Sequence, residues 1–75
     1  MKYIIEPFNE GQEMNCRHEI KGKQAAVLAK AGCIAQAIQT ALPQCAITCE
    51  VRPVRTDGEV FPVFSVTPDG KAVRL

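Results

Sequence analysis

The sequence predicts an α+β fold of two layers, with the element order ββαβββ, in which one helix covers one face of an antiparallel sheet. Only the segment from Lys23 to Leu42 is both long enough and periodic enough to form a helix. The rest of the chain consists of short alternating runs of apolar and polar residues, separated by turn-forming Gly, Pro, Asn and Asp. A helix laid on one face of a sheet buries both kinds of apolar pattern in one core.

The chain has 75 residues, so we expect a single domain over residues 1–75. A core of this size is only just sufficient, and a homodimer or a bound partner would add to it. The composition is 47% apolar and 23% charged, which argues against disorder. The net charge of +1 is not the basic excess typical of a dedicated nucleic-acid binder.

Targeting and redox signals are weak in this sequence. The N-terminal residues lack the apolar core of a signal peptide, and no segment approaches the length of a membrane span. We therefore expect a cytoplasmic protein that does not enter a membrane. Its four cysteines are then expected to be reduced.

The predicted helix has two different faces. An apolar stripe at helical spacing predicts the core face, and it contains Val27, Leu28, Ala31, Ile34, Ala35, Ile38, Ala41 and Leu42. Pro43 ends the helix because its ring cannot continue the hydrogen-bond ladder. The opposite face is rich in alanine, also carries Gly32 and Cys33, and has Lys30 only at its edge.

Before the helix, the sequence predicts a β-hairpin. The first strand runs from Lys2 to Phe8, and Asn9 to Gln12 form the turn. In the second strand, predicted from Met14 to Lys21, apolar and polar residues alternate, which predicts two faces. The predicted inward residues are Met14, Cys16, His18 and Ile20.

After the helix, the clearest strand has Cys45, Ile47, Cys49 and Val51 on its inward face. Asp57-Gly58 predicts a two-residue hairpin loop, whose register pairs Val51 with Phe64 and Cys49 with Val66. The same register places Pro53 opposite Pro62. At this position the nitrogen of each proline points away from the strand of the other proline. Val54 to Phe61 would then project as an arm beyond the main sheet. If the loop had three residues, the two prolines would no longer lie opposite each other. A last turn at Thr67 to Lys71 leads into a strand from Ala72 to Leu75.

No motif in the sequence points to catalysis or to a cofactor. Tetrahedral zinc is one interpretation of Cys16, His18, Cys45 and Cys49, but these residues lack the close cysteine spacing of structural zinc sites. Cys33 and His18 are a conceivable nucleophilic pair, but they are expected on faces that point apart. We predict no metal, no cofactor and no enzymatic activity.

Three surfaces are candidates for binding a partner. The outer face of the sheet is predicted to gather Arg17, Lys21, Arg52, Lys71 and Arg74, with Arg55 and Phe61 on the arm. A solvated face of mixed charge is the alternative, since Glu19 and Glu50 interleave with these residues. The smooth face of the helix presents Ala29, Cys33, Gln36 and Ala37, which would allow close packing of a second backbone. Its alternative is an alanine-rich solvent face.

The opening MKYII, the segment QAAVLAK and the closing PDGKAVRL accompany a hairpin, one helix and three strands. In this layout the chain resembles the small phage-encoded anti-CRISPR proteins, and it is similar in element order to an inhibitor of type I-F surveillance complexes. The resemblance implies a protein in the host-cell cytoplasm that binds a Cas subunit and blocks target DNA binding or cleavage. It would make Arg17, Lys21, Arg52 and Arg55 contact residues. The sequence departs from that inhibitor between Val54 and Phe61.

The function predicted from the sequence is therefore non-catalytic binding of a protein partner, with phage inhibition of a CRISPR–Cas effector complex as the specific form. One alternative is a small regulator that binds nucleic acid through a basic sheet face, and this partner is less favoured because the net charge is near zero. A self-assembling structural protein is the other alternative.

Overall fold

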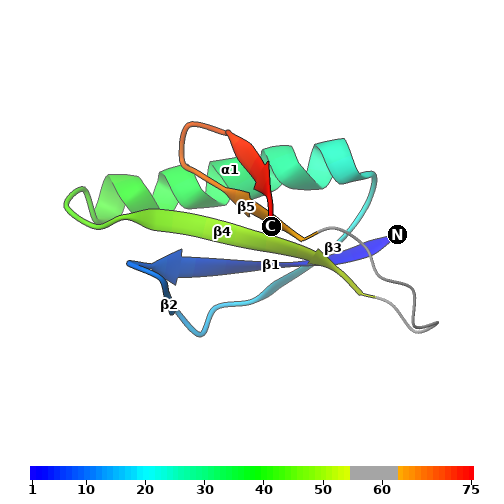
Figure 1. The fold of residues 1–75 in the computed structure, drawn as a ribbon, viewed down its shortest axis with the longest axis horizontal. Helices are drawn as coiled ribbons and strands as arrows, with labels where there is room; N and C mark the ends of the chain where they lie inside the picture. Colours follow the sequence, from blue (N-terminus) through cyan, green and yellow to red (C-terminus); the bar gives the residue numbers. More distant parts are fainter. Residues whose placement is uncertain (55–62) are drawn as a thin grey trace.

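The computed structural model describes residues 1–54 and 63–75, and in it one helix packs on one face of an antiparallel sheet (Figure 1). The predicted two-layer α+β fold is confirmed. The elements are β1 (Lys2–Asn9), β2 (Gln12–Glu13), β3 (His18–Lys21), α1 (Gln24–Ala41), β4 (Ile47–Pro53), β5 (Phe64–Val66) and β6 (Ala72–Arg74). The predicted Asp57-Gly58 loop, Arg55, Phe61 and most of the predicted arm lie outside the described residues.

The sheet has the strand order β2-β1-β4-β5-β6, and β3 also pairs with β1. Every neighbouring pair is antiparallel. Because β3 and β4 are both antiparallel to β1, they are parallel to each other, and α1 makes the crossover between them. In the part of the chain that the structure describes, no helix is long and apolar enough to cross a membrane.

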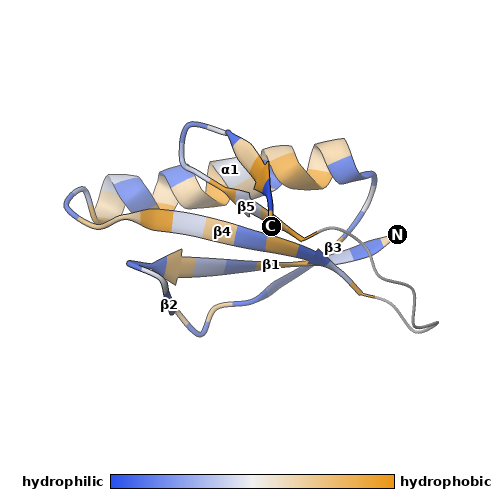
Figure 2. Ribbon diagram, viewed as in Figure 1, coloured by the Kyte–Doolittle hydropathy of each residue, from blue (hydrophilic) through white to orange (hydrophobic). Residues whose placement is uncertain are grey.

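The core lies between α1 and the inner faces of the central strands. Apolar and polar residues alternate along β4, as Figure 2 shows, so that one face of this strand meets the helix. The buried apolar residues are Tyr3, Ile5, Val27, Ala31, Ala35, Ile47, Cys49, Val51 and Val66. Ile34 and Ile38 pack against this cluster, as predicted, but Ala41 and Leu42 are exposed.

Gly32 corrects the prediction for the outer face of the helix, because it is buried. The turn between β5 and β6 packs on it, and a Cβ atom at Gly32 would lie 3.2 Å from the Cα of Gly70. Gly70 has φ of +88°, the left-handed conformation predicted for this turn. Two glycines thus allow the backbone of the hairpin to approach the helix closely.

The predicted second strand, Met14 to Lys21, forms only over its last four residues as β3, while Met14 to Arg17 are not in a strand and β2 lies before them. Asn9 pairs with Gln12 across a turn at Glu10 and Gly11, whereas Ile5 pairs with His18, so the register shifts by two residues between the two strands. Pro7 explains the break. Glu10 donates its N–H to the β4 side, and by alternation the nitrogen of Pro7 faces the β2–β3 side, where it has no hydrogen to donate.

The predicted register of the β4–β5 hairpin is confirmed at the two described pairs, Val51 with Phe64 and Cys49 with Val66. The predicted direction of the Pro53 nitrogen is wrong. Val54 donates its N–H to the carbonyl of Lys2 at 2.9 Å, so the nitrogen of Pro53 faces the β5 side instead. The pairing of β4 with β1 determines this alternation.

Gln39 holds the end of the helix to the start of β4. Its side-chain NH₂ group donates to the carbonyl of Cys45 at 2.7 Å and to the carbonyl of Leu42 at 2.9 Å. Its side-chain oxygen accepts a longer bond of 3.4 Å from the N–H of Ile47. These bonds satisfy the Cys45 carbonyl and the Ile47 N–H, and they add a second bond to the Leu42 carbonyl, which also accepts from the N–H of Cys45 at 3.1 Å.

We predict that Gln39→Ala lowers the free energy of unfolding by about 1–3 kcal/mol, because the Cys45 carbonyl and the Ile47 N–H lose their partner and the Leu42 carbonyl loses one of two bonds. Urea unfolding of the two proteins measures this difference. Gln36→Ala is the matched control, because Gln36 is exposed on the same helix, and we expect its effect to stay within about 0.5 kcal/mol. Equal effects of the two substitutions would contradict a role for Gln39 in holding the loop.

Candidate functional site

A shallow hollow of about 600 Å³ lies between the outer face of α1 and the turn that joins β5 to β6. Its lining residues come from two segments that are far apart in the sequence: Ala29, Gly32, Cys33, Gln36, Ala37, Pro68, Asp69 and Gly70. All four residues predicted for the helix interface are among them. The sequence did not indicate the second wall of the hollow, since it contains no signal that the last turn folds onto the helix.

The turn that forms this second wall is held by its own hydrogen bonds. The N–H of Gly70 donates to the carbonyl of Thr67 at 2.9 Å. The carboxylate of Asp69 accepts from the Thr67 hydroxyl and, at 3.2 Å, from the N–H of Lys71. These bonds lower the pKa of Asp69 below its ordinary value, so its carboxylate is charged at neutral pH.

The hollow combines an apolar floor with a charged rim. Ala29, Ala37 and Cys33 are exposed and present small side chains, which let another backbone come close to the helix. Gln36 adds an exposed amide, and the exposed Asp69 adds a negative charge at the turn. This arrangement suits an apolar segment of a partner that places a hydrogen-bond donor or a cation beside Asp69.

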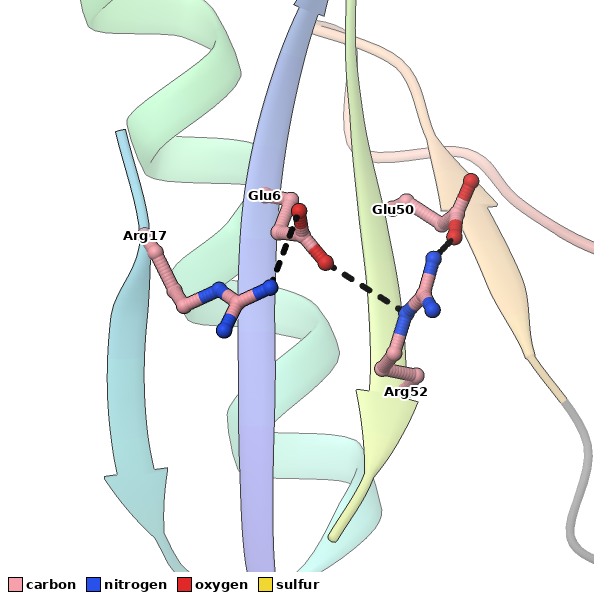
Figure 3. Close-up of polar contacts among 4 residues, drawn as sticks. All are labelled: Glu6, Arg17, Glu50 and Arg52. Carbon is pink, nitrogen blue, oxygen red and sulfur yellow. Dashed lines mark hydrogen bonds and ion pairs between the residues drawn. The ribbon is translucent and has the colours of Figure 1, made fainter. Parts of the chain in front are cut away.

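The outer face of the sheet is organised around Glu6, which is buried in the middle of β1 (Figure 3). Its carboxylate lies 3.7 Å from the guanidinium of Arg17 and 3.5 Å from that of Arg52. Arg52 also bonds to Glu50 on the same strand. The β3 register explains the first contact, since its continuation by one residue puts Arg17 opposite Glu6.

The predicted basic sheet face is not assembled. Arg17 and Arg52 are paired with carboxylates, and Lys21 lies opposite Lys2, whose amine is 3.9 Å from Glu19. Among the described strands and the adjoining Arg17, acidic and basic positions on this face are equal in number: Lys2, Glu6, Glu13, Arg17, Glu19, Lys21, Glu50 and Arg52. The alternative of a mixed-charge face describes it better.

Two other members of the predicted basic group lie elsewhere. Arg74 is opposite Phe64, which in turn is opposite the buried Val51, so Arg74 belongs to the helix side of the sheet. Lys71 lies at the end of the turn next to the hollow. Sequence reasoning missed Glu6, although its alternation with Ile5 and Pro7 would have placed it on the outer face.

The cysteines are dispersed through the structure. The thiol of Cys16 lies 3.5 Å from His18, while Cys49 is buried in the core and Cys33 is exposed at the hollow. Within residues 1–54 and 63–75, no three His, Cys, Asp or Glu side chains are grouped as ligands for a metal ion.

No protein-family model, curated protein or solved structure matches this chain.

The buried thiol of Cys49 predicts a loss of stability at high pH. Burial, with a smaller effect from Cys16, raises the pKa of Cys49 from 9.0 to about 11. The unfolded chain therefore loses this proton first, and the stability due to the protonated thiol is complete below pH 9 and lost as the pH rises to 11. We expect wild type to lose on the order of 2 kcal/mol more than Cys49→Ala over this range in urea unfolding. Parallel losses in the two proteins would contradict the assignment.

Glu6→Gln removes the charge that Arg17 and Arg52 share. Because both guanidinium groups are about half exposed to solvent, we expect a loss of only about 1 kcal/mol in the free energy of unfolding, and a smaller loss at high salt. Glu19→Gln is the control, since its pair with Lys2 is exposed on both sides. Urea unfolding at low and high salt measures both variants, and equal, salt-independent effects would show that the Glu6 pairs contribute nothing.

Proposed function

We propose that this chain is a non-enzymatic inhibitor that binds a protein subunit of a bacterial type I CRISPR–Cas effector complex and blocks target DNA binding or cleavage. The hollow between α1 and the β5–β6 turn is its contact surface in this proposal. The resemblance to phage-encoded anti-CRISPR proteins suggests the partner, and the hollow is the single observation that carries the choice of surface.

The composition of the hollow supports a protein partner. Its floor consists of small side chains on a helix face that has little charge. Such a face is poorly solvated when it is exposed to water, and little solvation is lost when a partner covers it. Asp69 at the rim would orient the partner, because a cation of the partner placed beside it would form an ion pair. The close approach of Gly32 and Gly70 keeps both walls of the hollow in contact with each other.

The sheet face supports the same choice by its charge balance. A protein that holds nucleic acid neutralises phosphates with arginine and lysine side chains. Here Arg17 and Arg52 are already paired with Glu6 and Glu50. A phosphate backbone would have to compete with these carboxylates, so a nucleic-acid partner on this face is disfavoured.

The test is a plaque assay in bacteria whose type I-F system targets the infecting phage. Expression of the wild-type chain should restore plaque formation, and Cys33→Arg should abolish it because a long charged side chain fills the hollow. In a pull-down with the purified surveillance complex, we expect Cys33→Arg to weaken binding by roughly tenfold or more.

Ala41→Arg is the matched control, since Ala41 is an exposed alanine of the same helix outside the hollow. It should behave as wild type in both assays. Failure of the wild-type chain to restore plaques would contradict the inhibitor function. Equal loss in both variants, or salt-sensitive retention of random DNA by the wild-type chain, would contradict the assigned surface.

A further inference from the structure

We propose that β6 is a self-pairing edge, through which two copies of this chain form an antiparallel dimer with one continuous sheet. β6 is the last strand in the order β2-β1-β4-β5-β6. All three of its residues are exposed, and Val73 and the following Leu75 are 48% and 67% exposed. This inference concerns a surface other than the hollow and does not depend on the proposed function.

The direction of the backbone groups shows which of them are free to pair. Leu75 donates its N–H to Val63 at 2.8 Å, and Thr67 donates to Lys71 at 3.0 Å, so the odd-numbered residues of this hairpin bond to each other. By alternation, the N–H and C=O groups of Ala72 and Arg74 point away from β5. No described residue lies beyond β6 in the sheet to receive them.

The opposite edge of the sheet is different. There, β2 has only two residues, and the break between β2 and β3 includes Asn15 at φ of +56°. Glu19 and Lys21 add exposed charges to β3. Short strands, irregular backbone and charges are features that prevent edge-to-edge pairing. β6 shares the first and the last, with three residues and Arg74, and differs in having no non-glycine residue at positive φ.

The free backbone groups limit the dimer to registers whose two-fold axis lies at Ala72, Val73 or Arg74. An axis at Ala72 would pair Arg74 with Gly70, which lies in the turn at φ of +88°. In the register that we propose, Ala72 faces Arg74 of the second copy, so that these residues exchange hydrogen bonds in both directions. The two-fold axis then passes through Val73, which meets Val73 of the second copy on the outer face of the sheet. An axis through Arg74 would instead put two like charges directly opposite each other.

The side chains on each face follow from this register. On the helix side, Arg74 lies opposite Ala72 of the second copy, and its diagonal neighbours are Gly70 and Arg74 of that copy. On the outer face, Val73 meets Val73 of the second copy, so that one of the large exposed apolar side chains of the described chain gains an apolar contact.

Sedimentation of the full chain over a series from micromolar to millimolar concentrations tests the proposal. We expect a reversible monomer–dimer equilibrium, and Val73→Lys should weaken it by about tenfold or more because like charges then meet at the axis. Val73 is half exposed, so this variant should keep its fold, which circular dichroism verifies. A wild-type chain that stays monomeric at millimolar concentration, or a dimer that Val73→Lys leaves intact, would overturn the proposal.

A cross-linking experiment tests the register itself. In a Cys16→Ser, Cys33→Ser background, Val73→Cys should form an intermolecular disulfide, because opposed residues at this position have Cα atoms about 4.5 Å apart. Ala72→Cys is the control, since it faces Arg74 and not itself, and it should cross-link much more slowly. Equal rates for the two variants would overturn the register, as would a dimer that Cys33→Arg abolishes and Val73→Lys does not.

Discussion

The antiparallel ladder between β1 and β4 is the constraint on which the rest of this structure depends. It pairs seven residues on each strand without a break, from Tyr3 with Pro53 to Asn9 with Ile47. Pro7 and Pro53 both lie within it, and both direct their nitrogens outward, so neither removes a bond from the central ladder. The N–H groups that these prolines lack are instead missing on the sides that face β2, β3 and β5. Among the described residues, the β1–β3 ladder has four pairs and the β4–β5 ladder has three.

This arrangement determines what each surface can present. The interruption opposite Pro7 lets the second strand resume with a new register, and that register brings Arg17 to the buried Glu6. The N–H that Pro7 lacks thus allows the register in which Arg17 pairs with Glu6, and this pairing contributes to the neutral outer face. On the other side, the short β4–β5 ladder leaves the β5–β6 hairpin attached through few bonds, and its contact with Gly32 provides a second point of attachment.

Much of the fold was predictable from the sequence because its signals are local. Helix periodicity, the apolar alternation of β4 and the Asp-Gly turn predicted the layers and the pairing of Val51 with Phe64, which the structure bears out. The direction of the Pro53 nitrogen was predicted wrongly, since β1, a strand distant in sequence, determines it. The helix half of the hollow was predictable from small residues at helical spacing. The turn half was not, because only the packing of Gly70 on Gly32 brings it there.

The β5–β6 hairpin links the two surfaces assigned to binding. Its turn is one wall of the hollow, and its last strand is the free edge of the sheet. A second copy paired along β6 would add hydrogen bonds to a hairpin that, among the described residues, pairs with β4 at three positions and contacts Gly32. Such pairing restrains the turn at Asp69 and Gly70, and a restrained turn loses less conformational entropy when a partner enters the hollow. Self-association at the edge and binding at the helix are therefore expected to reinforce each other, since both restrain the same β5–β6 hairpin.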